Sequence, residues 1–458
     1  MAQTGGQLLA KVPSVTHVGI VGGGMLGLGL ARRLKQAGCE VTVIEGAPRI
    51  GGLASAQKLG PITWDRFYHV TLLSDSALRE LLGELGLADS IEWRTTRTGF
   101  FTDGHLYPFN NALDFLRFPP LNLIDKVRLG LTILTASRIM DGVPLEHELA
   151  VDWLTRLSGR RTVERIWLPL LKAKLGANAT QASASFIWAI IARMYAARRS
   201  GLKEERFGYV KGGYDVVLQR LEAHLAQRGV ELVTGQPVEN VESDGDGATV
   251  RFGDGTTRRF DAVVMTVPCP RVSALCPQLT DSERERLGRV VYQGIVCPSL
   301  LLDEPLAPYY VTNITDDWVP FTAVIEMTAL VDPATFGGKH LVYLPRYLTQ
   351  TANDWGKSDE EILDESVSAL ERMYPHFHRG QVRATQVSRV RNVLAVTTRD
   401  YSATCLPPLR TSQERLFVVN SAQIANGTLN VNETLILADR QGRELLPLLA
   451  ANVSAVGS

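Results

Sequence analysis

A glycine-rich turn near the N-terminus constrains the fold of this chain more than any other feature. The turn comprises Gly22-Gly23-Gly24-Met25-Leu26-Gly27. The apolar run before it, over 15–21, predicts a β-strand, and the periodic apolar residues after it, over 25–37, predict a helix that Gly38 ends. A second apolar strand is predicted over 40–45. This order of strand, turn, helix and strand predicts a Rossmann-type dinucleotide-binding unit.

The three spaced glycines have separate steric purposes in such a unit. Gly22 permits the tight turn, Gly24 lets the backbone approach a pyrophosphate, and Gly27 lets the helix pack closely against the strand. Met25 and Leu26 open the helix, where free N–H groups and the positive end of the helix dipole attract phosphate. The turn therefore predicts a dinucleotide site rather than a turn without a ligand.

An acidic residue at the end of the second strand supports the same interpretation. Glu45 stands 18 residues after Gly27, where a carboxylate can accept hydrogen bonds from the ribose hydroxyls of an adenosine. Its charge would repel a 2′-phosphate, which disfavours NADP at this site. Gly46 follows directly and is expected in the same contact.

The pattern continues past the second strand and resembles a known family. Gly22-x-Gly24-x-x-Gly27-x-x-x-Ala31-x-x-Leu34-x-x-x-Gly38-x-x-Val41-x-x-x-Glu45, followed by Gly51-Gly52, resembles the extended signature of the amine oxidase, protoporphyrinogen oxidase and phytoene desaturase superfamily. The resemblance implies FAD as the cofactor. It also places the backbone of Gly51 and Gly52, with Arg49 and Leu53 beside them, against the FAD diphosphate.

Weaker resemblance extends over most of the chain and implies further FAD contacts. Val238 corresponds to the residue whose backbone meets the adenine, and Thr266 to the strand end beneath the flavin. Asn420 stands where relatives carry an acidic residue near the ribityl phosphate. Leu429 and Asn430 precede a final helix whose N-terminus would point at the flavin N1–C2=O edge. Plain helix capping is the alternative explanation of the two asparagines.

These elements predict an α/β fold in which a Rossmann-like FAD-binding domain is interleaved with a mixed α+β substrate domain. The FAD-binding domain is expected over 12–75, 207–275 and 393–458. The substrate domain is expected over 76–206 and 276–392, where strand and helix alternation is lost and tryptophan, proline and long apolar helical stretches appear.

The most unusual local cluster is Trp64-Asp65-Arg66-Phe67-Tyr68-His69. The resemblance places this region near the flavin. Tyr68 and His69 could therefore hydrogen-bond the flavin N5 or O4, or act as an acid and base pair. The alternative is that His69 is a structural histidine and that Tyr68 is packing.

Two other charged residues are candidates for the active site. Lys211, before a pair of glycines, could touch the substrate or an FAD phosphate, or could be a solvated lysine at a helix start. Glu326 interrupts an apolar run and could line the substrate cavity with a raised pKa, or could face solvent from a strand. Simple amine oxidation is disfavoured, because no aromatic residue follows Phe417 and the segment 292–297 lacks the family's lysine.

Composition excludes several classes of protein. Lys and Arg together number 48, as do Asp and Glu, so no global charge favours nucleic acid. Five scattered cysteines form no Cys-x-x-Cys pair, and the sequence predicts no metal site. No signal peptide or spanning helix is recognisable, so a cytoplasmic protein is expected. The basic amphipathic segment 112–140 predicts peripheral membrane contact, an apolar substrate tunnel or ordinary core.

The expected function is FAD-dependent removal of a hydride from a small apolar or amphipathic substrate. Two alternatives remain open. One is a flavin enzyme without net redox, like the UDP-galactopyranose mutases, in which arginines such as Arg346 and Arg391 would converge on a diphosphate. The other is a flavin-binding scaffold without turnover. The sequence leaves the electron acceptor and the oligomeric state open.

Overall fold

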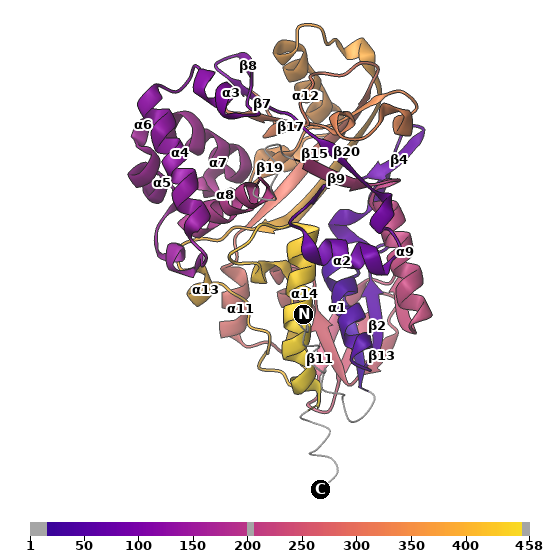
Figure 1. Cartoon of the computed structure of the whole chain (residues 1–458). Helices are drawn as coiled ribbons and strands as arrows, with labels where there is room; N and C mark the ends of the chain where they lie inside the picture. The colour runs from indigo at the N-terminus through magenta and orange to yellow at the C-terminus, as the bar shows by residue number, and fades with distance from the viewer. Residues whose placement is uncertain (1–15, 199–205, 451–458) are drawn as a thin grey trace, which may run out of the picture.

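The computed structural model describes residues 16–198 and 206–450, which form two interleaved domains (Figure 1). The lower half of the view holds a parallel sheet with its helices. The upper half holds a larger mixed sheet, with a group of helices on one side of it. This arrangement confirms the expected α/β class, with a Rossmann-like domain and a mixed α+β domain.

The parallel sheet forms the centre of the nucleotide-binding domain. Its strand order is β10 (Val230–Thr234), β2 (Glu40–Glu45), β1 (His17–Val21), β14 (Ala262–Met265) and β21 (Leu416–Val418). Four of the five residues of β1 are buried. Strands covered on both faces need apolar runs rather than alternation, which explains why the sequence predicted β1.

Each face of this sheet is covered by a different layer. Helices cover one face: α1 (Met25–Gln36), α9 (Gly213–Gln227) and α14 (Val431–Ala450). A small antiparallel sheet and a helix cover the other: β11 (Val238–Ser243), β12 (Ala248–Phe252), β13 (Thr257–Phe260) and α10 (Cys269–Leu275). Gly29 lets α1 and α14 approach closely, since a Cβ there would lie 3.1 Å from Cβ of Ala438.

Helix α2 (Ser76–Glu84) differs from the expected domain division. The segment 76–206 was expected in the substrate domain, but Leu78, Leu81 and Leu82 of α2 are buried in the same apolar core as α1 and α14. The leucines recur at helical spacing and lie on the buried face of the helix. The sequence could not show which elements α2 packs against, because an amphipathic pattern indicates only that one face of the helix is buried.

The substrate domain is built on an eight-stranded sheet. The strand order is β19 (Arg346–Leu348), β15 (Tyr292–Leu302), β18 (His340–Tyr343), β17 (Ala323–Glu326), β16 (Val311–Ile314), β7 (Thr98–Thr102) and β8 (His105–Pro108), and β20 (Val382–Ala395) also pairs with β15. All eleven residues of β15 are buried. This strand and β20 run as a long antiparallel pair from the substrate domain toward the nucleotide-binding domain (Figure 1).

Helices surround this sheet. They are α3 (Ala112–Arg117), α4 (Leu123–Arg138), α5 (Ala150–Ser158), α6 (Arg160–Thr162), α7 (Leu168–Leu175), α8 (Ala184–Arg198) and α12 (Asp359–Met373), with α11 (Asp281–Gly288) and α13 (Tyr401–Thr404) nearer the parallel sheet. Smaller strands connect the domains: β3 (Ala56–Leu59), β4 (Ile62–Asp65), β5 (Thr71–Leu72), β6 (Ile91–Thr95) and β9 (Arg206–Val210). Across 16–198 and 206–450, no helix combines the length and apolarity needed to cross a bilayer.

Candidate functional site

The glycine-rich turn adopts the close-packed geometry that the sequence predicted. Gly22 has a φ of 120°, a conformation that side chains strongly disfavour. A Cβ on Gly27 would lie 1.9 Å from the carbonyl oxygen of Gly22, so only glycine fits where α1 begins. A Cβ on Gly24 would meet only Cα of Gly52, at 4.0 Å. The space beside Gly24 is therefore open to a ligand.

The N-terminus of α1 has the properties of an anion site. No side chain caps it, and its first turn holds no acidic residue. Met25 and Leu26 are buried, so their N–H groups require a partner that the side chains do not supply. A phosphate group would satisfy these donors and the dipole together. The residues present therefore fit a dinucleotide pyrophosphate.

A second glycine pair closes over this helix end. Gly51 donates its N–H to the carbonyl oxygen of Gly23 at 2.8 Å, and exposed Gly52 follows. The structure thus brings together the two glycine segments that the sequence assigned to one diphosphate. Arg49 lies further out, with a side chain that is 77% exposed and 3.6 Å from Asp215. Leu53 packs against the core of the substrate domain.

A hollow beside β2 matches the expected adenosine site. Glu45 lines it, and its carboxylate accepts hydrogen bonds of 2.8 Å from the N–H groups of Gly23 and Ala47. The complete lining is Val21, Gly22, Ile44, Glu45, Gly46, Pro237, Val238, Val267, Arg271 and Leu275. Predicted residues from three separate segments therefore meet at one hollow. Thr266 stands behind the turn, where its hydroxyl donates to the carbonyls of Val21 and Gly22.

Arg271 is a lining residue that the sequence reasoning missed. It lies on α10, and its guanidinium donates to the carbonyl oxygen of Val238 at 3.3 Å. The available signal was Pro268, which ends the preceding strand and begins a helix at the carboxyl edge of the sheet. A basic residue in the first turn of such a helix faces the nucleotide end of a Rossmann unit.

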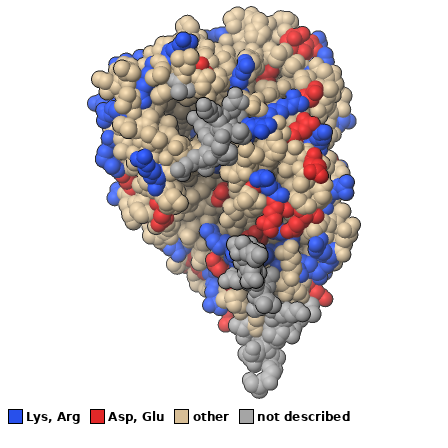
Figure 2. Space-filling model, in the orientation of Figure 1, with Lys and Arg blue, Asp and Glu red and all other residues tan. Residues whose placement is uncertain are grey.

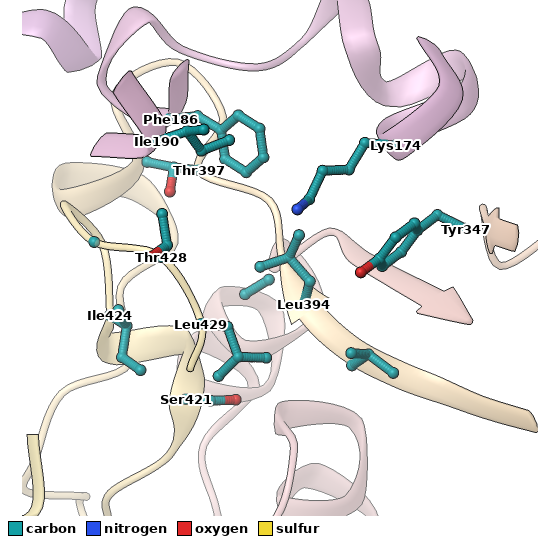
Figure 3. Close-up of a pocket in the computed structure, with 13 residues that line it drawn as sticks. Lys174, Phe186, Ile190, Tyr347, Leu394, Thr397, Ser421, Ile424, Thr428 and Leu429 are labelled. Carbon is teal, nitrogen blue, oxygen red and sulfur yellow. The ribbon is translucent and has the colours of Figure 1, made fainter. Parts of the chain in front are cut away.

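A second hollow, partly open to solvent, lies between the two domains (Figure 3). Its lining comes from five regions of the chain: Lys174; Phe186 and Ile190; Tyr347; Val393, Leu394, Ala395 and Thr397; and Ser421, Ile424, Gly427, Thr428 and Leu429. Leu429 is thus the one predicted FAD-contact residue in this lining. Most of the wall is apolar, which suits a site for a largely apolar molecule.

Lys174 is the one charged side chain in this lining, and the sequence reasoning did not single it out. It extends from α7 toward the ring of Tyr347, with Nζ 5.4 Å from the ring centroid (Figure 3). No carboxylate of the described residues lies within ion-pair distance of this ammonium group. The hollow therefore presents a half-buried positive charge beside an apolar wall. One of two lysines on a short, largely apolar helix gives no such signal in the sequence.

Tyr68 and His69 point in different directions from one loop. The hydroxyl of Tyr68 lies 3.1 Å from that of Tyr347, which connects Tyr68 to the wall of the second hollow. His69 packs on the ring of Tyr214 with centroids 4.7 Å apart. Burial lowers the pKa of His69 to about 4, so this ring is neutral at physiological pH. Neither residue itself lines the second hollow.

Asp65 is a buried carboxyl group beside this histidine. It accepts a hydrogen bond of 2.7 Å from the N–H of Tyr214, and its other oxygen lies 3.8 Å from Nδ1 of His69. Burial raises the pKa of Asp65 to about 7, although the Tyr214 N–H opposes this shift. Gly213 makes the contact with α9 feasible, since a Cβ there would lie 2.7 Å from the carboxylate.

Glu326 and Lys211 lie away from both hollows. Glu326 is buried, so it does not face solvent as the strand alternative expected, and it does not line the second hollow. Its carboxylate accepts hydrogen bonds from the N–H groups of Leu306 and Ala307, and burial raises its pKa to about 8. Lys211 is 67% exposed and lies 3.1 Å from Glu92, in agreement with the solvated alternative.

The two asparagines use their side chains as caps. Asn420 is fully buried; it accepts from the N–H of Ala422 at 3.1 Å and donates to the carbonyl of Val267 at 3.2 Å. Asn430 accepts from the N–H of Glu433 at 3.0 Å, at the start of α14. The capping alternative therefore accounts for both geometries, and Asn420 holds the ends of β14 and β21 together.

Comparisons with known proteins agree with this geometry. Residues 27–429 match the family of flavin containing amine oxidoreductases. AofH of Mycobacterium tuberculosis, provisionally named a flavin-containing monoamine oxidase, is 25% identical over 284 residues, which cover 57% of this chain and 59% of AofH. The 15-cis-phytoene desaturase of Capsicum annuum is 21% identical over 396 residues, which cover 78% of this chain and 64% of the desaturase. The coproporphyrinogen III oxidase of Mycobacterium bovis is 25% identical over 276 residues, which cover 56% of this chain and 60% of the oxidase. The matches thus span about three fifths of the length of these relatives.

Solved structures show the same fold. A protein of Exiguobacterium sp. 255-15, provisionally named a protoporphyrinogen oxidase, aligns with a TM-score of 0.74 at 18% identity, covering 95% of this chain and 99% of that one. Putrescine oxidase aligns with a TM-score of 0.70 at 17% identity, covering 95% and 99%. The expectation of a flavin cofactor is confirmed by the family match, which covers most of the chain. The chain belongs to the flavin containing amine oxidoreductase family.

Proposed function

We propose that this protein uses FAD to remove a hydride from a largely apolar substrate that carries an anionic group. The single observation that carries the proposal is the second hollow. One of its walls is the segment 421–429, which includes Leu429, a residue that the family resemblance implies lies near the flavin. The opposite walls come from the substrate domain. Bound FAD would supply the hydride acceptor.

The residues of the hollow act on the substrate in two ways. Phe186, Ile190 and Leu394 give an apolar wall that binds an apolar body and displaces water from it. Lys174 would bind a carboxylate on the same molecule, because its ammonium has no acidic partner in the described structure. The position of Lys174 would thus fix the orientation of the bound substrate.

The same charge disfavours a cationic substrate. A protonated amine in this hollow would meet Lys174 instead of the carboxylate or neutral aromatic groups that attract ammonium ions. Two substrates named among the relatives therefore suit this hollow unequally. A diamine such as putrescine is disfavoured, whereas a carboxylated apolar compound such as coproporphyrinogen III is favoured.

The test is anaerobic reduction of the flavin. FAD-loaded protein is mixed separately with coproporphyrinogen III and with putrescine, and the visible absorbance of oxidised flavin is followed. We expect bleaching with the carboxylated compound alone. Bleaching by putrescine alone would contradict the proposal. Exposure of the reduced protein to air then distinguishes an oxidase, reoxidised within seconds, from a dehydrogenase or desaturase that uses another acceptor.

The geometry favours neither alternative function. A mutase of the UDP-galactopyranose type needs arginines free to bind a diphosphate. Arg346 is instead buried and paired with Asp354 at 2.7 Å and Glu365 at 2.9 Å, and Arg391 stacks on Trp355 at 4.6 Å. A scaffold without turnover needs a flavin sealed from small molecules, whereas the second hollow opens to solvent.

A further inference from the structure

The exposed apolar residues of this protein are concentrated in one short segment. Eleven large hydrophobic side chains are exposed in the described residues, and nine of them lie between 113 and 143. We call these nine the α3–α4 face: Leu113, Leu116, Leu123, Ile124, Val127, Leu131, Leu134, Met140 and Val143. Scattered single apolar residues are normal on a surface, but a cluster of this kind marks an interaction site.

The spacing on α4 places its exposed apolar residues on one side of the helix. Ile124, Val127, Leu131 and Leu134 recur every three or four residues, and Ile124 is 70% exposed. The opposite side is buried: Leu129 and Ala136 pack against neighbouring helices. The helix is therefore held by one apolar stripe and presents a second one outward.

Hydrogen bonds from side chains to backbone groups hold the α3–α4 face in place. Lys126 turns inward and donates to the carbonyl oxygen of Leu116 at 2.7 Å, which joins α4 to α3. The N-terminus of α4 is closed by a capping box of Asn122 and Asp125. These contacts join the two helices into one apolar platform.

The charges around this face are mostly positive. Arg117, Arg128 and Arg138 are exposed, and none forms an ion pair with a carboxylate of the described residues. Asp141 is the one exposed carboxylate between 113 and 143, since Asp114 is half-buried and Asp125 is buried. Basic side chains gather over these helices at the upper left of the space-filling view (Figure 2). Apolar residues between unpaired arginines complement a surface of acyl chains under anionic headgroups.

We propose that the α3–α4 face docks this protein on an anionic lipid bilayer. The helices lie in the interface with the apolar side chains inserted among the acyl chains, while Arg117, Arg128 and Arg138 contact lipid phosphates. A two-fold dimer through the same face would bring these arginines toward their own copies, with no carboxylates to pair them. The charge pattern therefore favours lipid over a second copy of this chain.

The docking face lies one helix layer from the second hollow. The indole of Trp188 on α8 donates to the carbonyl oxygen of Ala136 on α4 at 3.0 Å. Phe186 and Ile190 of the same α8 line the hollow. A substrate dissolved in the bilayer would thus have a short path to the hollow. This consequence rests on the proposed function, whereas the docking itself does not.

The experiment is flotation of the FAD-loaded full chain with lipid vesicles. One set of vesicles is phosphatidylcholine alone, and the other contains phosphatidylglycerol as well. We expect binding to the anionic vesicles that weakens as salt rises, and little binding to the neutral ones. A variant with Ile124→Glu, Val127→Glu and Leu131→Glu should lose binding, and a variant with Arg117→Gln, Arg128→Gln and Arg138→Gln should lose affinity by about tenfold or more.

The matched control adds the same charge to another exposed helix surface. Ala223, Ala226 and Gln227 of α9 are exposed, and their replacement by Glu should leave vesicle binding unchanged. FAD content and thermal unfolding show that each variant is folded. Absence of binding by the folded wild type at low salt would overturn the proposal. Equal vesicle binding by the wild type and the apolar-face variant would also overturn it. A third contrary result would be a wild type that binds no vesicles but forms a dimer without lipid, with the dimer lost in the apolar-face variant.

Discussion

The backbone N–H of Gly23 donates a hydrogen bond of 2.8 Å to Oε2 of Glu45. The glycine-rich turn and the end of the second strand are therefore joined by the carboxylate that is expected to bind the ribose. Gly51 completes the arrangement by donating to the carbonyl of Gly23. Turn, carboxylate and second glycine pair form one preorganised site before any nucleotide arrives.

Replacing Glu45 should weaken FAD binding without unfolding the protein. Glu45→Ala removes the expected ribose acceptor and leaves the N–H of Gly23 without its partner. We expect the Kd for FAD to rise by about 10- to 100-fold, the range for a hydrogen bond to a charged group. Fluorescence titration of the apoprotein with FAD measures this. Glu40→Ala, at the exposed start of the same strand, is the control, and equal loss in both variants would contradict the assignment.

Lys174→Met should change substrate affinity more than flavin affinity. The substitution keeps the length of the side chain and removes the charge in the second hollow. We expect the apparent Kd of a carboxylated substrate to rise by about 10- to 100-fold. FAD content should remain normal. Lys172→Met, two residues earlier and exposed, should behave as the wild type. An unchanged substrate affinity in Lys174→Met would exclude this lysine from substrate binding.

Asp65→Asn should change how stability depends on pH. The folded-state pKa of Asp65 is raised to about 7, so its carboxyl stays protonated when the unfolded chain has already ionised. Its contribution to stability is therefore present below about pH 4 and is lost as pH rises toward 7. The variant has no such loss. Relative to the wild type, its free energy of unfolding should increase by about 2–4 kcal/mol between about pH 4 and pH 8.

Urea unfolding at several pH values measures this difference. His69, whose pKa is lowered to about 4, contributes with the opposite sign in the same range, because the folded state then binds fewer protons. It is present in both proteins and cancels in the comparison. A constant difference between Asp65→Asn and the wild type from about pH 4 to pH 8 would show that folding does not raise the pKa of Asp65.

Tyr68 and Tyr347 should be energetically coupled. Their hydroxyl groups lie 3.1 Å apart in a partly buried setting, and a hydrogen bond of this kind contributes about 1 kcal/mol. Tyr68→Phe and Tyr347→Phe should therefore each destabilise the protein, and the double variant should cost less than the sum of the two. A double-mutant cycle on unfolding free energies measures the coupling. Strict additivity would mean that the bond does not form in solution.

The parallel sheet and its glycine turn could be predicted from the sequence because the constraints there are local. The turn needs glycine at Gly22 and Gly27 for steric reasons, and buried parallel strands give uninterrupted apolar runs. The helix at 359–373 carries signals of the same local kind, since Ser358 caps its N-terminus and its buried apolar residues recur at helical spacing. These signals lie within the segments themselves.

The second hollow could not be predicted in the same way. Its walls come from segments as distant as Lys174 and Leu429, and their meeting depends on the long β15–β20 pair. Glu326 illustrates the same limit. The sequence showed a carboxylate in an apolar strand, but it could not show that the backbone N–H groups of Leu306 and Ala307 would bind it. Contacts between distant segments decide whether such a residue is structural.

The central claim is that FAD binds at the N-terminus of α1, and Gly24→Ala tests it most directly. Gly24 has φ of −75° and ψ of 174°, which alanine adopts freely, and a Cβ there meets only Cα of Gly52, at 4.0 Å. The apoprotein should therefore fold and unfold as the wild type does, while the added methyl group occupies the space the pyrophosphate needs. Gly83→Ala, on α2 with open space around it, is the control.

The measurement is the FAD content and FAD affinity of the three purified proteins, with thermal unfolding of the apo forms recorded alongside. We predict that the wild type and Gly83→Ala hold FAD, and that Gly24→Ala has lost most of it with an unchanged apo melting temperature. Wild-type affinity for FAD in Gly24→Ala would contradict the account.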